Sequence, residues 1–165
     1  AGKVGSGAAK AVGAKVTAVG RPKPAAEAPT RAYVFGDEVE VAGHEEGYEG
    51  SWYAAEVVMT KDSEQVLVQY DALYDEETAQ PLKEWVHPEL LRPLPPAAPG
   101  GWHSSLAAGQ ALELSHDDGW WQVNFLSACL PQYKVQSAHW GREHLVSVAS
   151  LRPGWEYRPA TQTWG

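Results

Sequence analysis

The chain has 165 residues, of which 44% are hydrophobic and 21% charged, and its net charge is −8 at pH 7. This composition is typical of a globular protein with room for one ordinary domain or two very small ones. Apolar runs are far shorter than the roughly 20 residues that a membrane-spanning helix requires. A single cysteine, Cys129, excludes an internal disulfide, and no Cys/His spacing is that of a zinc site. We therefore expect an intracellular, reducing compartment, and the absence of an initiator Met indicates a piece of a longer chain.

The charges are distributed unevenly along the sequence. Residues 1–31 carry six basic residues against one acidic residue and no aromatic residue, a composition that predicts a disordered basic linker. Residues 33–95 carry fifteen acidic residues against three basic ones, a net charge of −12. A unit this acidic repels the phosphate backbone of nucleic acids and favours a basic partner. The alternative is an acidic surface that only keeps the protein soluble.

Short strands separated by turn residues are predicted after the linker. The runs are residues 38–41, 52–59, 66–70, 85–86 and 90–93, with glycines between several of them. In the first run Val39 and Val41 alternate with glutamates, which is the period of two of a strand with one buried face. Several such strands within about sixty residues predict a small, strongly bent barrel.

The same pattern occurs a second time. Residues 36–41 match residues 109–114, and the Leu-Arg-Pro of residues 91–93 recurs at 151–153. His-Glu-Glu-Gly-Tyr at 44–48 matches His-Asp-Asp-Gly-Trp at 116–120, which places Trp52 opposite Trp121. Matched blocks in the same order indicate a tandem repeat. The prediction is an all-β protein with two barrels at residues 32–96 and 102–159, joined by a Pro- and Gly-rich hinge.

These motifs resemble a known family. A Gly-Asp-x-Val-Glu-Val strand, an acidic turn into Gly-Tyr-x-Gly-Ser-Trp-Tyr-x-Ala, a Val-x-Val-x-Tyr strand and a closing Leu-Arg-Pro-x-Pro-Pro look like an Agenet domain. The Agenet domain belongs to the Royal superfamily of Tudor-like barrels and usually occurs in pairs. Similar plant proteins read dimethylated lysine 9 of histone H3 at heterochromatin, so the resemblance implies a nuclear chromatin reader. Other Agenet pairs, as in the fragile X protein, imply the alternative of a protein scaffold that does not depend on lysine methylation.

A methyl-lysine reader needs electron-rich rings around the ammonium group, because cation–π attraction contributes roughly 0.5–2 kcal/mol and the rings exclude water. The resemblance assigns this cage to Tyr48, Trp52 and Tyr70, in the first loop, at the start of the second strand and at the end of the third. Tyr53 is left for packing, because adjacent strand residues face opposite sides. The alternative for each ring is burial in the core.

Carboxylates at the edge of the cage can accept the N–H that a mono- or dimethylated lysine retains. Asp71, directly after Tyr70, is the candidate for this role. Glu45, Glu46 and Asp75 are candidates for binding the basic residues of the histone tail, and their alternative is a solvated acidic loop.

The second repeat has Ser137 in place of Tyr70, so we expect it to buttress the first, with Trp102, Trp121 and Trp155 in its core or at the interface. No catalytic, cofactor or metal motif was found: His44 and His116 are expected to be exposed turn residues, and Cys129 a small buried side chain. The sequence therefore predicts a binding module, not an enzyme. Specific nucleic-acid binding is not expected, because only the basic linker favours it.

Overall fold

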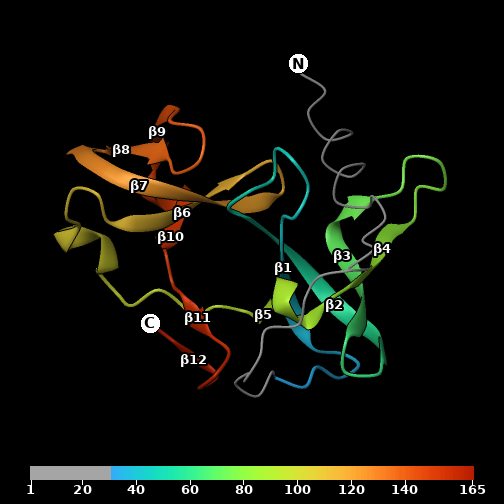
Figure 1. The fold of residues 1–165 in the computed structure, drawn as a ribbon. Helices are drawn as coiled ribbons and strands as arrows, with labels where there is room; N and C mark the ends of the chain where they lie inside the picture. Colours follow the sequence, from blue (N-terminus) through green and yellow to red (C-terminus); the bar gives the residue numbers. More distant parts are fainter. Residues whose placement is uncertain (1–30) are drawn as a thin grey trace.

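The computed structural model describes residues 31–165, whose regular structure consists of strands and three short 3-10 helices (Figure 1). The first repeat contains β1 (Glu38–Ala42), β2 (Ser51–Lys61), β3 (Gln65–Tyr74), β4 (Pro81–Val86) and β5 (Leu91–Pro93). The second contains β6 (Ala111–His116), β7 (Gly119–Cys129), β8 (Gln132–Ser137), β9 (Glu143–Ser147) and β10 (Leu151–Pro153). The remaining elements are η1 (Pro88–Leu90), η2 (Trp102–Ser105), η3 (Val148–Ser150) and the hairpin of β11 (Tyr157–Arg158) and β12 (Thr163–Trp164). The linker predicted for residues 1–31 lies outside the described residues, apart from Arg31.

Each repeat has the same antiparallel topology, β5-β1-β2-β3-β4 in the first and β10-β6-β7-β8-β9 in the second. The long second strand of each repeat is irregular at the same place, between Val57 and Met59 in β2 and between Phe125 and Ser127 in β7. A bulge bends the strand and increases its twist. The prediction of an all-β fold with two small, strongly bent Tudor-like barrels is confirmed.

Each barrel has its own core. Alternate residues of β2 are buried, from Tyr53 through Val57, and they pack on Val68 of β3 and Leu91 of β5. The second core is smaller and is centred on Leu112, Phe125 and Val135.

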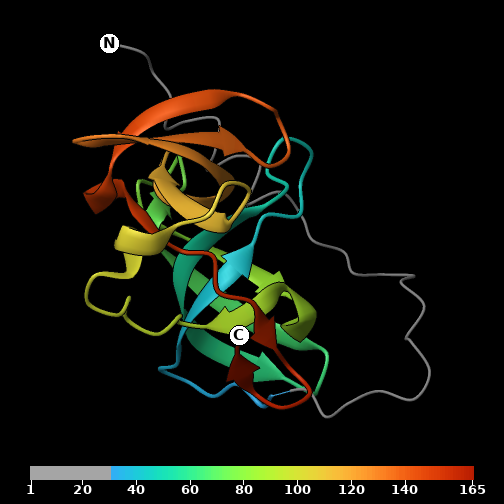
Figure 2. The same ribbon diagram turned by 90° about the vertical axis from the view of Figure 1, so that its left-hand side faces the viewer.

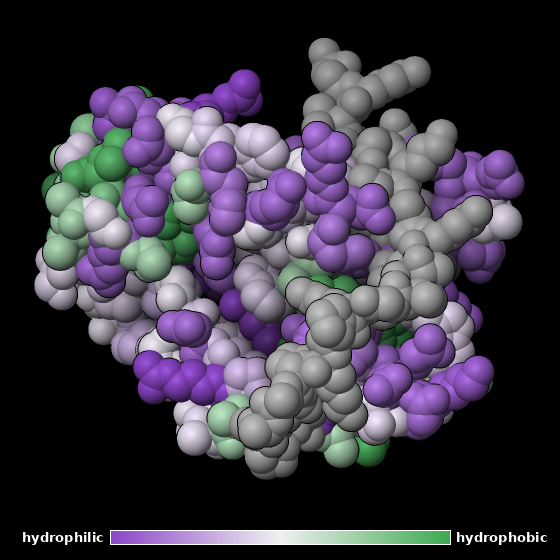
Figure 3. All heavy atoms as spheres, viewed as in Figure 1, coloured by the Kyte–Doolittle hydropathy of each residue, from purple (hydrophilic) through white to green (hydrophobic). Residues whose placement is uncertain are grey.

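The outer surface seen in Figure 3 is mainly hydrophilic, with only small apolar patches. Cys129 is exposed, so the expectation that it is buried was wrong; the last residues of β7 lie beyond the core.

The two repeats differ in the turn after their first strand, and this corrects the predicted alignment. In the second repeat Asp117 and Asp118 form a two-residue hairpin turn with φ of 47° and 63°, whereas the first repeat has a longer loop. The register pairs Ala42 with Trp52 and Ser115 with Trp120. Trp120 is therefore the equivalent of Trp52, and Trp121 is the equivalent of Tyr53. The predicted alignment was wrong by one residue, because the shorter turn removes residues that the sequence match had retained.

The barrels are joined edge to edge by a short antiparallel seam. Ser51 of β2 pairs with Trp121 of β7, and Trp52 pairs with Trp120, so that one continuous sheet runs through both repeats. Among residues 31–165 no helix is long and apolar enough to cross a membrane.

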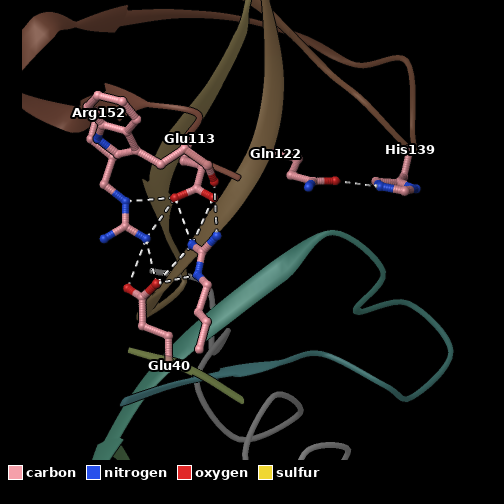
Figure 4. A network of polar contacts seen from close by, with 7 residues as sticks. Glu40, Glu113, Gln122, His139 and Arg152 are labelled. Carbon is pink, nitrogen blue, oxygen red and sulfur yellow. Dashed lines mark hydrogen bonds and ion pairs between the residues drawn. The ribbon is translucent and has the colours of Figure 1, made fainter. Parts of the chain in front are cut away.

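Beside this seam two carboxylates and two guanidinium groups form a closed network (Figure 4). Arg92 donates from Nε to Glu40 of its own repeat at 2.9 Å and from Nη2 to Glu113 of the other repeat at 2.9 Å. Arg152 does the reverse, with Nε donating to Glu113 at 2.7 Å and Nη2 to Glu40 at 2.8 Å. Glu40, Glu113 and Arg92 are almost fully buried. Two positive and two negative charges therefore neutralise one another in a place that is shielded from water.

The two equivalent tryptophans cover this network. The guanidinium carbon of Arg92 lies 3.8 Å from the ring centroid of Trp52, and that of Arg152 lies 4.1 Å from the ring centroid of Trp120. The C-terminal hairpin adds a third ring, because Trp164 lies 5.2 Å from Arg92. Figure 2 shows β11 and β12 crossing back from the second repeat toward the first. This hairpin was not predicted, and its two-residue strands have no clear sequence period.

Replacement of Glu40 by Gln should lower the free energy of unfolding by about 3–5 kcal/mol, because it leaves two buried guanidinium groups short of a counter-charge. Lys134→Gln is the control: its partner Glu143 lies at 3.4 Å, both side chains are exposed, and the change should stay within about 1 kcal/mol. Urea denaturation of both variants measures the difference. Equal midpoints would contradict a role for the network in stability.

Candidate functional site

Trp52 and Tyr53, adjacent on β2, lie on opposite faces of the sheet. Tyr53 is 1% exposed and faces the first core, whereas the ring of Trp52 is stacked on Arg92 at the seam. The prediction placed Trp52 in the cage and Tyr53 in the packing; Tyr53 does pack in the core, whereas Trp52 is stacked on Arg92, on the opposite face of the strand. The physical reason is the Glu40–Arg92 pair, which occupies the face that Trp52 covers.

Tyr70 lies on the same side as Tyr53, and like Tyr53 it is 1% exposed. Its hydroxyl donates to Oε1 of Glu84 at 3.1 Å. Burial, with the negative charge of Glu84, raises the pKa of Tyr70 far above its usual value. In this structure the ring is a core residue behind the site, so Tyr48, Trp52 and Tyr70 do not form one open box.

Tyr48, in the loop between β1 and β2, is instead grouped with Tyr53 and Trp121. The ring centroids lie 6.3 Å apart for Tyr48 and Tyr53, 5.9 Å for Tyr48 and Trp121, and 6.4 Å for Tyr53 and Trp121. The last pair stands nearly perpendicular, at 81°. We call these three rings the aromatic cluster. Tyr48 and Trp121 are half-buried, so the cluster reaches the surface while Tyr53 forms its inner wall.

The second repeat positions two of the three rings. The indole N–H of Trp121 donates to the carbonyl of His116 at 2.8 Å, and the hydroxyl of Tyr53 donates to the carbonyl of Asp117 at 3.2 Å. Gly119 lies flat against Tyr53: a Cβ at this position would come within 2.8 Å of the ring. The hairpin turn between β6 and β7 therefore fits only because Gly119 lacks a side chain.

A buried acid lies beside Tyr70. Glu84 on β4 is 5% exposed, pairs across the sheet with Val68, and accepts the hydroxyl hydrogen of Tyr70. Burial, together with the charge of Glu45, raises the pKa of Glu84 to about 8, although the hydrogen bond from Tyr70 opposes the shift. His44 from the β1–β2 loop places its Nε2 atom 3.5 Å from Oε1 of Glu84. The predicted exposed turn histidine is in fact mostly buried beside a carboxyl group.

The predicted peptide-binding acids lie in different places. Asp71 is exposed on β3, facing away from Tyr70, and burial together with Glu38 raises its pKa. Asp75 accepts the backbone N–H groups of Glu77 and Thr78, which lowers its pKa and closes the β3–β4 turn. Glu45 and Glu46 are in the same loop as Tyr48, and Glu46 is exposed. Of the four acids, these two lie nearest in sequence to the aromatic cluster.

The second repeat lacks the equivalent group. By register, His144 occupies the position of Glu84, and Ser137 that of Tyr70. The ring centroids of His144 and His116 lie 6.1 Å apart. Burial, and then the nearby imidazole of His116, lower the pKa of His144. Residues 31–165 contain no cluster of three or more metal-ligating side chains. The candidate site therefore belongs to the first repeat, with one wall supplied by the second.

Sequence reasoning missed Trp121 as a wall of the site, and it missed Glu84. No sequence pattern could have indicated Trp121, because its contact with Tyr48 depends on the pairing of β2 with β7. A pattern did exist for Glu84, which occupies the same alternating face of β4 as the buried Val86. An acid in the inward phase of a strand indicates a buried, partnered carboxyl group.

Trp52→Ala should lower the free energy of unfolding by about 2 kcal/mol or more, because it exposes a desolvated cation–π contact and one side of the charge network. Binding of ligand by molecules that remain folded should change less than twofold. Thermal melting and peptide titration at a temperature well below the transition measure the two quantities. Loss of binding in a variant of unchanged stability would show that Trp52 contacts the ligand after all.

Known proteins are similar to this chain in sequence. Residues 36–96 match the model of the Agenet domain family. The Arabidopsis thaliana protein AGENET DOMAIN (AGD)-CONTAINING P1 is 35% identical over 101 residues, which are 61% of this chain and 19% of that protein. The Arabidopsis DUF724 domain-containing protein 3 is 34% identical over 86 residues, 50% of this chain and 12% of that protein. The chain thus spans a fifth or less of the length of these curated relatives.

Solved structures agree in fold. The crystal structure of Arabidopsis thaliana AGDP1 AGD34 aligns with a TM-score of 0.70 and 26% identity, covering 79% of this chain and 87% of that one. That of the ADCP1 tandem Agenet domain 3-4 aligns with a TM-score of 0.67 and 24% identity, covering 79% and 85%. Residues 36–96 are therefore an Agenet domain, and a second barrel of the same topology follows it.

Proposed function

We propose that this segment is a nuclear chromatin reader that binds a methylated histone tail at the aromatic cluster, and that its ligand is histone H3 dimethylated at lysine 9. The observation that carries the proposal is the arrangement of Tyr48, Tyr53 and Trp121, three electron-rich rings with centroids 5.9–6.4 Å apart. The resemblance to tandem Agenet readers in plants supports the choice of histone mark and compartment.

The chemistry of such a cluster suits a methylated ammonium group. Methylation keeps the positive charge of lysine but removes N–H donors, so aromatic faces replace water better than they do for the unmodified side chain. Tyr53 and Trp121 stand nearly perpendicular and provide two adjacent walls, and Tyr48 provides the outer one. The loop that carries Tyr48 also carries Glu45, Glu46 and Glu49, part of the acidic excess of residues 33–95, and this charge suits a tail rich in lysine and arginine. Agenet domains are protein-interaction modules, and this use requires no catalytic group.

Tyr48→Ala should weaken binding of an H3 peptide dimethylated at lysine 9 at least tenfold, because it removes one cation–π wall without emptying the core. Trp140→Ala is the matched control, since its ring is 55% exposed on the β8–β9 turn and touches no part of the cluster. Calorimetric titration with methylated and unmodified peptides gives the affinities. Equal affinity for both peptides would favour the alternative of a scaffold that ignores lysine methylation.

The association rate of the same peptide should fall several-fold as salt rises from about 0.05 to 0.3 M, because the Debye length shrinks below ~10 Å and screens long-range attraction. The dissociation rate should change little, since the ring contacts are short-ranged. Stopped-flow fluorescence separates the two rates. A salt effect confined to the dissociation rate would contradict attraction by the acidic surface as the cause.

A further inference from the structure

Residues 48–51 form a tight turn that begins with Tyr48 and that we call the Tyr48 turn. The carbonyl oxygen of Tyr48 accepts the backbone N–H of Ser51 at 3.1 Å and its hydroxyl at 2.6 Å. The N–H of Tyr48 donates to the carbonyl of Glu45 at 3.0 Å. Gly50 has a φ of 78°, the left-handed conformation that the third residue of a type II turn requires. The backbone that carries the outer ring of the aromatic cluster is therefore fixed within its own turn.

Gln122 of β7 connects this turn to the second repeat. Its backbone N–H donates to the carbonyl of Gly50 at 2.9 Å, and its own carbonyl accepts the N–H of Ala138 in the β8–β9 turn at 3.0 Å. Its side-chain Oε1 lies 3.1 Å from Nε2 of His139 in the same β8–β9 turn (Figure 4). Because a carbonyl oxygen only accepts, Nε2 carries the hydrogen and donates it. Gln122 thus bonds to the Tyr48 turn and to the β8–β9 turn at once.

The imidazole of His139 also lies directly against Gly50. A Cβ at Gly50 would come within 2.4 Å of Cδ2 and 2.6 Å of Nε2 of His139, and within 3.0 Å of Oε1 of Gln122. The two side chains therefore cover the backbone of the Tyr48 turn and leave no room for a side chain there. His139 and Gln122 are both exposed and belong to neither core. Exposed side chains contribute little to global stability, so this contact acts mainly on the turn that it touches.

We infer that His139 and Gln122 are positioning residues for the aromatic cluster: they hold the Tyr48 turn against the second repeat and keep the outer ring in place for a methylated ammonium group. This inference rests on the proposed function. It extends the role of the second repeat from the inner rings, whose Tyr53 and Trp121 donate to carbonyls of the β6–β7 turn, to the third ring.

The inference predicts a particular kinetic effect. Tyr48 is half-buried, and its ring centroid lies 5.9 Å from that of Trp121 only while the turn is closed. When the turn opens, the cluster lacks one wall, so the apparent affinity falls with the fraction of closed molecules. The loss should appear in the association rate, because a complex that has formed contains the same ring contacts. Tyr48→Ala differs in this respect, since it removes a contact from the complex and should raise the dissociation rate.

The test uses the whole chain and an H3 peptide dimethylated at lysine 9, with both rates measured by stopped-flow fluorescence. His139→Ala should weaken binding roughly three- to tenfold, the range that loss of one hydrogen bond allows. The association rate should fall by the same factor, and the dissociation rate should stay within twofold. The melting temperature should change by about 2 °C or less, because His139 is exposed. Wild-type affinity in this variant, or a loss confined to the dissociation rate, would overturn the inference.

Three further variants separate positioning from a general structural role. His139→Gln places an amide donor at similar reach and should restore the affinity to within twofold of wild type. Trp140→Ala is the matched control, because it removes the neighbouring exposed side chain of the same turn, and it should leave both rates unchanged. His139→Ala combined with Gln122→Ala should lose no more affinity than either change alone, since each removes the same contact. Additive losses, or failure of His139→Gln to restore binding, would contradict the inference.

Amide hydrogen exchange tests the positioning contact without any ligand. In His139→Ala the N–H groups of Ser51 and Gln122, which close the turn and join it to β7, should exchange several-fold faster, and in Trp140→Ala they should not. Unchanged exchange in His139→Ala would overturn the inference even if the wild-type chain binds the peptide. If the wild-type chain binds no methylated peptide but exchange changes as expected, the proposed function is wrong, the contact holds the turn, and its role in ligand binding falls with that function.

Discussion

The ion network at the seam is the interaction on which the rest of the molecule depends. Each of Glu40 and Glu113 is bound by one arginine of its own repeat and one of the other. A buried charge that loses half of its partners costs several kcal/mol, more than a barrel of this size can easily offset. Neither repeat can therefore keep its Glu–Arg pair in this environment alone. The seam fixes β2 against β7, and this contact brings Trp121 to Tyr48 and Tyr53.

The two repeats have kept the same residues where they meet and different residues where we propose that the ligand binds. Glutamate, arginine and tryptophan recur at the seam, in the pairs Glu40 and Glu113, Arg92 and Arg152, and Trp52 and Trp120. At the equivalent of Glu84, by contrast, the second repeat has His144. A carboxyl group can neutralise a bound cation, whereas an imidazole cannot. The symmetry of the fold is thus combined with an asymmetric distribution of charge.

Acidic groups act over two different distances at the candidate site. The exposed acids of the first repeat act over distances comparable with the Debye length and set how fast a basic tail arrives. The buried carboxyl of Glu84 acts only at short range, on Tyr70 and His44, where low dielectric strengthens each contact. Its second oxygen has no hydrogen-bond partner.

The amino-acid sequence by itself determined the all-β fold, the tandem repeat and the acidic first unit, because these follow from local periods, turn residues and charge counts that need no distant partner. The family resemblance, read from the same motifs, predicted Tyr48 as a ligand-binding ring, and this stays a prediction. The sequence also showed that Trp52 and Tyr53 face opposite sides, since neighbouring strand residues always do. Which side carries the site was decided only by the tertiary structure. Arg92, forty residues further along the chain, stacks on Trp52 and leaves Tyr53 to the aromatic cluster. Trp121 joined that cluster through a strand pairing between repeats that no local pattern encodes.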